Sequence, residues 1–155
     1  MAEDDPTKDD RRTVFGWCMY DWANSAYVTT VAVGLLPRYF ADAVVPPGGV
    51  RIGGVVYATD TLWAVIVGAA TFIAFLSAPV LGAIADFSAA KKRFLLTFAY
   101  TGSLFTLLLY TCRSGDVFKT LVFFLVTQVS FIGANVFYDA FLPHIASPER
   151  MDWVS

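Results

Sequence analysis

Four polar side chains lie close together at the start of a long apolar stretch, in the segment "YDWANSAY" at residues 20–27. A helix turns by about 100° per residue, so Asp21, Asn24 and Ser25 fall on one side of a helix through this segment. Tyr27 lies one turn beyond Asn24. Carboxylate, amide, hydroxyl and phenol groups all form hydrogen bonds, so this side of the helix could bind a small polar solute.

A second polar face lies near the other end of the sequence. Gln128, Asn135 and Asp139 are spaced by seven and four residues, which puts them on one narrow stripe of a helix, with Tyr138 beside it. An ionisable group inside a membrane span is costly, which makes Asp21 and Asp139 candidate functional residues. Two structural alternatives stay open. The amides could serve only to join helices, and the acids could serve only as caps of helix ends near the membrane surface.

The elements that carry these residues are predicted to cross a membrane. Hydrophobic residues make up 57% of the chain, charged residues 15%, and the mean hydropathy is +0.59, which is typical of a membrane protein. Charge-free runs occur at four places, and about 20 apolar residues cross a bilayer. We therefore predict an all-α membrane protein with four transmembrane helices, at about 14–41, 60–85, 94–112 and 120–141.

The distribution of Lys and Arg favours both ends of this chain in the cytoplasm. In a four-span arrangement, seven of the 11 Lys and Arg residues lie on the side of the two ends, and an excess of positive charge marks the cytoplasmic side. Residues 1–13 are then a polar cytoplasmic segment before a bundle at 14–155. The acid-rich start "MAEDDPTKDD" lacks the pattern of a secretory signal peptide.

Stripes of small residues predict which helix faces pack. Small side chains at four-residue spacing let a neighbouring helix approach closely. One such stripe follows the second predicted helix, at Ala70, Ala74, Ala78 and Gly82. Another lies on the first helix opposite the polar side, at Ala23, Ala26, Thr30 and Gly34. The third helix carries no charge, and we expect it to lie at the periphery and face lipid.

A charged loop joins the second and third predicted helices. It reads "GAIADFSAAKK" from residue 82 to residue 92 and continues into a third basic residue. A carboxylate at the end of one helix can pair with a base or with the free amides at the start of the next helix. The loop residues that could form such a contact are Gly82, Asp86, Lys91, Lys92 and Arg93.

This loop resembles the signature G-x-L-A-D-x-x-G-R-K of the major facilitator superfamily, with Ala89 and Ala90 where the signature has Gly and Arg. Together with "YDWANSAY" and "NVFYDAFLPHIASPERMDWVS", it looks like the branch of vacuolar effluxers, autophagy-related permeases and their bacterial relatives. The resemblance implies that the loop is a cytoplasmic conformational latch and that the first and fourth helices line a central cavity. It also implies about twelve spans in two halves, so we expect this chain to be an N-terminal part whose missing C-terminal helices complete it.

The resulting prediction is a secondary transporter that works by alternating access, with efflux of amino acids or similar small solutes implied by the resemblance. The predicted solute path contains Asp21, Asn24, Ser25, Tyr27, Gln128, Asn135, Tyr138 and Asp139. The predicted location is the bacterial inner membrane, with a vacuolar membrane as the alternative. The expected partners are lipids and a small solute, without nucleic acid or cofactor.

Two rival classes are weighed against a transporter. A complete four-helix protein could act as a homodimeric small exporter or as a non-transporting assembly partner. A membrane enzyme is disfavoured, because the sequence has no Cys-x-x-Cys pair, no phosphate-binding Gly loop and no His/Cys metal set.

Overall fold

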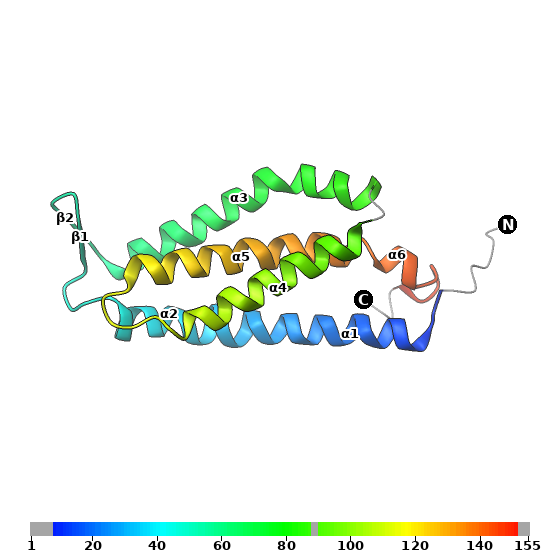
Figure 1. The fold of residues 1–155 in the computed structure, drawn as a ribbon, viewed down its shortest axis with the longest axis horizontal. Helices are drawn as coiled ribbons and strands as arrows, with labels where there is room; N and C mark the ends of the chain where they lie inside the picture. The colour runs from blue at the N-terminus through cyan, green and yellow to red at the C-terminus, as the bar shows by residue number, and fades with distance from the viewer. Residues whose placement is uncertain (1–7, 88–89, 152–155) are drawn as a thin grey trace.

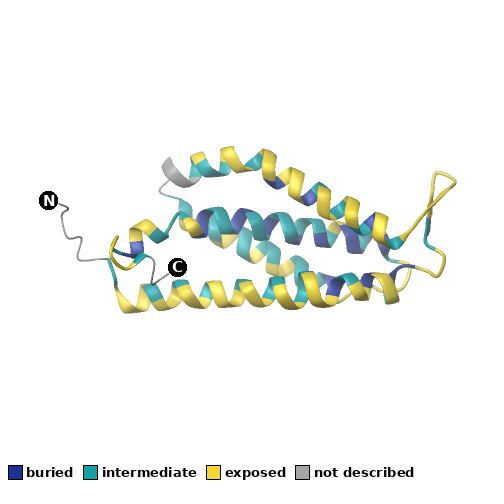
Figure 2. Ribbon diagram, turned by 180° about the vertical axis from the view of Figure 1, so that it is seen from behind, coloured by how far each residue is buried: buried dark blue, intermediate teal, exposed yellow. Residues whose placement is uncertain are grey.

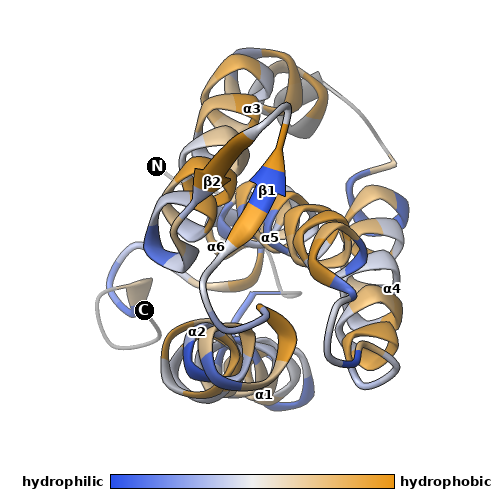
Figure 3. Ribbon diagram, turned by 90° about the vertical axis from the view of Figure 1, so that its left-hand side faces the viewer, coloured by the Kyte–Doolittle hydropathy of each residue, from blue (hydrophilic) through white to orange (hydrophobic). Residues whose placement is uncertain are grey.

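The computed structural model describes residues 8–87 and 90–151, without the side chains of residues 85–87. Helix α5 (Val117–Asp139) lies between α3 (Thr59–Phe87), α4 (Lys91–Leu109) and a long first helix at residues 11–44 (Figure 1). A view along the bundle shows these three helices arranged around α5 (Figure 3). The short helix α6 (Leu142–Ile145) lies at one end, which we call the α6 end.

The long first helix alternates between two helical patterns. It consists of α1 (Arg11–Ala26), the π-helical segment η1 (Tyr27–Leu35), α2 (Leu36–Tyr39) and a second π-helical segment, η2 (Phe40–Val44). A π turn closes from residue i to i+5 and is wider than an α turn. In agreement, the Leu36 amide donates to the carbonyl of Val31, and the Val45 amide donates to the carbonyl of Phe40.

The helices begin and end at residues that differ from the predicted bounds. The first begins at Arg11 rather than at 14, because the Asp10 carboxylate caps it by accepting from the Thr13 amide at 2.9 Å. Helix α4 begins at Lys91 rather than at 94, since Lys and Arg are good helix formers. Helices α4 and α5 end at Leu109 and Asp139, before the predicted 112 and 141.

A two-stranded sheet corrects the prediction of a purely helical chain. Strands β1 (Val50–Ile52) and β2 (Val55–Tyr57) pair antiparallel at the end opposite α6, which we call the hairpin end (Figure 1). The two residues between them, Gly53 and Gly54, have φ angles of 58° and 86°. Such positive angles are required at both positions of a type I′ hairpin turn, and Gly adopts them without strain.

Two of the four expected spans have the length and composition to cross a membrane within the described residues, at Thr59–Ile84 and Val117–Ile145. The four transmembrane helices of the sequence prediction are therefore only partly supported. Charged residues lie inside the first helix, at Asp21, Arg38 and Asp42, and at the start of α4, at Lys91, Lys92 and Arg93. The mainly helical fold itself agrees with the prediction.

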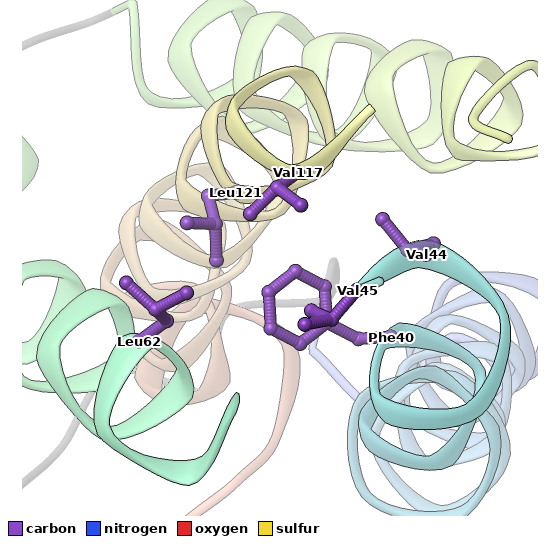
Figure 4. Packing of buried hydrophobic residues seen from close by; sticks show 6 residues of the cluster. All are labelled: Phe40, Val44, Val45, Leu62, Val117 and Leu121. Atoms are coloured by element: carbon purple, nitrogen blue, oxygen red, sulfur yellow. The ribbon is translucent and has the colours of Figure 1, made fainter. Parts of the chain in front are cut away.

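The apolar core lies toward the hairpin end. One cluster joins η2 and the residue after it to α3 and α5, through Phe40, Val44, Val45, Leu62, Val117 and Leu121 (Figure 4). A second, formed by Leu36, Leu109, Cys112 and Phe124, brings in α4. By contrast, α1 and η1 contain no buried residue (Figure 2). The first helix is therefore anchored at one end of the bundle.

Helix packing differs from two of the stripe predictions. Ala70 and Ala74 are buried, but Ala78 is exposed, so the α3 stripe packs over only part of its length. The prediction that the small stripe of the first helix packs on a neighbour is wrong within this chain, because the four residues of the stripe are exposed. The polar side of the first helix faces α5 instead, since its amide and phenol groups find partners there.

Helix α4 lies beside α5 at the edge of the bundle (Figure 3), with Leu96, Tyr100, Leu104 and Leu107 exposed, and its other face packs closely on α5. A Cβ atom on Gly102 would lie 3.2 Å from the Cβ of Ser130, so the two helices approach closely at this glycine. The rings of Phe94 and Phe98 stack on Phe137 of α5 at 5.2 and 6.0 Å. The aromatic rings thus hold α4 along α5, a contact that a search for charged or polar residues does not reveal.

Candidate functional site

The polar faces predicted on the first helix and α5 lie opposite each other. The Asn24 Nδ2 atom donates to Oδ1 of Asn135. One helical turn farther toward the hairpin end, the Tyr27 hydroxyl donates to Oε1 of Gln128 at 3.2 Å. Both bonds connect residues more than a hundred positions apart, so they join two separate parts of the chain.

A hollow of about 280 Å³ lies beside these bonds, and we call it the polar hollow. Six of the predicted path residues line it, together with Val28, Thr29 and Phe131. These six are Asp21, Asn24, Ser25, Asn135, Tyr138 and Asp139. The two carboxylates, which are exposed, therefore share one polar surface, and no Lys, Arg or His is among the residues that line it.

An aromatic stack joins α1 to the end of α5. The ring of Tyr138 lies 4.4 Å from that of Trp17 and 5.0 Å from that of Tyr20. Its hydroxyl donates to the Trp17 carbonyl oxygen at 3.3 Å, and the residue is only 5% exposed. Trp17 and Tyr20 were not predicted as site residues, although their spacing of three from each other places both on one helix face.

A larger and mainly apolar hollow of about 420 Å³ lies between the first helix, α4 and α5. We call it the apolar hollow. Asn24 and Phe131 line both hollows, whereas Tyr27 lines the apolar hollow alone. Its α4 wall includes Phe98, Gly102, Ser103 and Thr106, none of which was predicted. Gly102 and the hydroxyl residues next to it in the sequence could have indicated this wall.

The predicted latch residues lie at the α6 end of α3 and α4. Gly82 is half-buried, and Lys92 and Arg93 are exposed in the first turn of α4. The Lys91 Nζ atom lies 3.1 Å from Nε2 of His144 in α6, which connects the loop to the end of the chain. The side chain of Asp86 lies outside the described residues, so no partner is assigned to it.

The described residues contain no group of three or more His, Cys, Asp or Glu side chains placed to hold a metal ion. The arrangement that they do show is a row of hydrogen-bonding groups between two helices, with two carboxylates at one edge. Such a row can bind a polar molecule by forming hydrogen bonds in place of those that the molecule forms with water.

Comparisons with known proteins place the chain in a family. Residues 9–152 match the family described as "Vacuole effluxer Atg22 like". The chain is 36% identical over 139 residues to the "Uncharacterized MFS-type transporter YxiO" of Bacillus subtilis (strain 168). That match covers 90% of this chain and 31% of the relative, so the chain spans about a third of its relative's length. No solved structure matches. In agreement with the sequence resemblance, this chain is a membrane protein that belongs to the vacuole effluxer Atg22-like family.

Proposed function

We propose that this chain forms the first four spans of a secondary transporter that works by alternating access. The first helix and α4 then cross the membrane beside α3 and α5, although charged residues lie within or at the start of each. The matching relative is named an MFS-type transporter and is about three times as long as the matched region. Later helices of the same protein would provide the other wall of the path.

The observation that carries the proposal is the pair of bonds between the first helix and α5. Polar groups at membrane depth must find partners or water, because lipid offers neither. Here the partners are side chains on two different helices, Asn24 to Asn135 and Tyr27 to Gln128. Bonds of this kind can be exchanged for bonds to a solute when the helices separate.

The polar hollow suits a solute with an amine and a carboxyl group. Carboxylates such as Asp21 and Asp139 accept hydrogen bonds from an ammonium group, and amide NH₂ groups such as that of Asn135 donate to a carboxylate. We therefore propose amino acids or similar small solutes, with efflux as the direction, in keeping with the family description. Asp21 or Asp139 is the proposed carrier of a coupling proton.

We propose the cell membrane as the location, with a vacuolar membrane as the alternative, and both ends of this chain in the cytoplasm. The support is the excess of Lys and Arg at the α6 end, which includes the three basic residues at the start of α4.

The test uses the whole protein reconstituted in liposomes that are loaded with single radiolabelled amino acids. We expect Asn135→Leu to reduce efflux at least about tenfold, the effect of losing about 1.4 kcal/mol of solute or transition-state binding. Asp139→Asn is expected to change the pH dependence of the rate. The matched control is Thr71→Val, because Thr71 is exposed on α3 and, among the described residues, its hydroxyl bonds only to the Val67 carbonyl of its own helix.

Flux unchanged by Asn135→Leu would contradict the proposed path. Absence of flux for every amino acid, in a protein whose melting temperature matches that of the control, would contradict the proposed solute class. The rival four-helix homodimer is distinguished by particle mass in detergent: a dimer of 17.0 kDa chains that transports without further helices would favour that rival.

A further inference from the structure

The first helix contains a long π-helical segment directly beside the polar hollow. Segment η1 runs for nine residues, Tyr27–Leu35. π turns are rare and occur mostly as single turns inserted in α-helices, frequently at functional sites. Its first residue, Tyr27, bonds to Gln128, and Val28 and Thr29 line the polar hollow. A stretch of unusual backbone thus begins where the two polar faces meet.

Glycine at position 34 makes the wide turns sterically possible. A Cβ atom at Gly34 would lie 2.8 Å from the carbonyl oxygen of Thr29, five residues earlier. Real Cβ atoms do not approach a backbone oxygen so closely, so a larger residue would require the turn to change. Pro37 follows in α2 and has no amide hydrogen, which removes one further backbone bond from this part of the helix.

The two ends of the first helix are held very differently. On the hairpin side of η1, Leu36, Phe40 and Val44 are at most 5% exposed. The Tyr39 hydroxyl also donates to the Cys112 carbonyl oxygen at 2.7 Å. On the other side, α1 has no buried residue. Contacts to α5 on that side include the Asn24 bond and the Tyr138 stack, which are side-chain contacts that can separate.

We propose that η1 is a conformational switch whose turns pass between the π and the α pattern. Changing a π turn to an α turn shifts the helix by one residue, which corresponds to about 100° of rotation. Because the hairpin end is anchored, the rotation moves α1. It turns Asn24 away from Asn135 and opens the polar hollow, while the clusters at the hairpin end stay in place.

The experiment measures distances between spin labels on the protein in lipid nanodiscs, without any solute. One pair, at the native exposed Cys18 and at Leu96→Cys on α4, reports on the α6 end. The second pair, Arg38→Cys and Phe118→Cys with Cys18→Ser, reports on the hairpin end. Cys112 is 1% exposed and stays in both backgrounds.

Gly34→Ala is expected to shift the distances of the first pair and to leave those of the second pair unchanged. Ala favours an α-helix over Gly by about 1 kcal/mol, which corresponds to about a fivefold change in the population ratio. The matched control is Gly16→Ala in α1, because a Cβ atom there meets nothing within 4 Å. Identical distributions in Gly34→Ala and the unsubstituted protein would overturn the switch, as would equal shifts at both pairs.

Hydrogen exchange on the unsubstituted protein provides a second test that does not depend on how the variant folds. Amides of Tyr27–Leu35 are expected to exchange faster than those of Leu36–Tyr39, although both segments lie in one continuous helix. Equal protection of the two segments would contradict the proposal. Neither measurement involves transport, so the switch and the proposed solute path can fail independently.

Discussion

Asn24 and Asn135 form a pair that joins two helices and that also belongs to the proposed solute path. An Asn amide has two N–H donors and one carbonyl acceptor. Their shared bond uses Nδ2 of Asn24 and Oδ1 of Asn135, and the described residues give no partner to Oδ1 of Asn24 or Nδ2 of Asn135. One acceptor and one donor group therefore remain for a ligand. The alternatives of helix joining and solute binding, which the sequence left open, are compatible with each other.

Asp116 provides a titration test at the residue scale, outside the predicted spans. Its carboxylate accepts from the Arg113 amide at 3.1 Å and from Nζ of Lys119 at 3.2 Å. These bonds, with the Arg113 amide as the larger cause, lower the pKa of Asp116 below its ordinary value of 3.8. The ionised carboxylate thus stabilises the loop fully at pH values above the ordinary pKa of 3.8. This stabilisation is lost as the pH falls through the lowered pKa.

We expect Lys119→Gln to raise the pKa of Asp116 while leaving it below 3.8, because the Arg113 amide remains. Carbon-13 NMR of the carboxyl group in detergent micelles measures this midpoint. Lys119→Arg keeps the charge and serves as the control. A midpoint that does not respond to Lys119→Gln would show that the ion pair contributes nothing in solution, as many exposed pairs do.

At the scale of elements, close packing of α4 on α5 depends on Gly133. A Cβ atom at this position would lie 2.8 to 3.0 Å from three atoms of the Phe98 ring. Phe98 in turn stacks on Phe137 and lines the apolar hollow. The ring cannot move without disturbing that stack, so the glycine fixes the distance between the two helices.

Gly133→Ala is expected to destabilise the protein by about 1–3 kcal/mol, the usual cost of overpacking. Gly68→Ala is the matched control in α3, because a Cβ atom there meets nothing within 4 Å. It is expected to be neutral or stabilising, since Ala is the better helix former. Thermal unfolding in detergent, followed by circular dichroism, compares the two variants. An equal effect of both substitutions would mean that the Phe98 contact does not limit the packing.

The sequence predicted those elements that follow from composition and period, and it missed those that depend on local geometry. Charge-free runs located the helices, and the helical period brought Asn24 and Asn135 onto facing sides. The hairpin was missed although Gly53 and Gly54 separate two β-branched stretches, which is a recognised turn signal. Segment η1 has no such signal, because an analysis at 3.6 residues per turn assumes the α pattern. The role of the polar residues in a solute path stays a prediction.

Across the whole molecule, apolar clusters close the bundle at the hairpin end, whereas aromatic stacks together with polar contacts hold it at the α6 end. There the Asp9 amide donates to the Ile145 carbonyl oxygen at 2.9 Å, and its carboxylate accepts from the Ser147 amide at 3.2 Å. Lys91 reaches His144 from α4. Polar contacts exchange with water more readily than buried apolar ones, so we expect opening to occur at the α6 end.

The number of spans and their orientation can be tested by labelling single cysteines in whole cells with a membrane-impermeant maleimide. In a background with Cys18→Ser, suitable exposed sites are Arg51→Cys in β1, Ser114→Cys before α5 and Glu149→Cys after α6. Four spans with cytoplasmic ends predict labelling of the first two sites in intact cells, and labelling of the third only after permeabilisation. If only α3 and α5 crossed, α4 would stay on one side of the membrane, and Ser114→Cys would lie opposite Arg51→Cys. Labelling of Glu149→Cys in intact cells would reverse the orientation and place the polar hollow toward the outside.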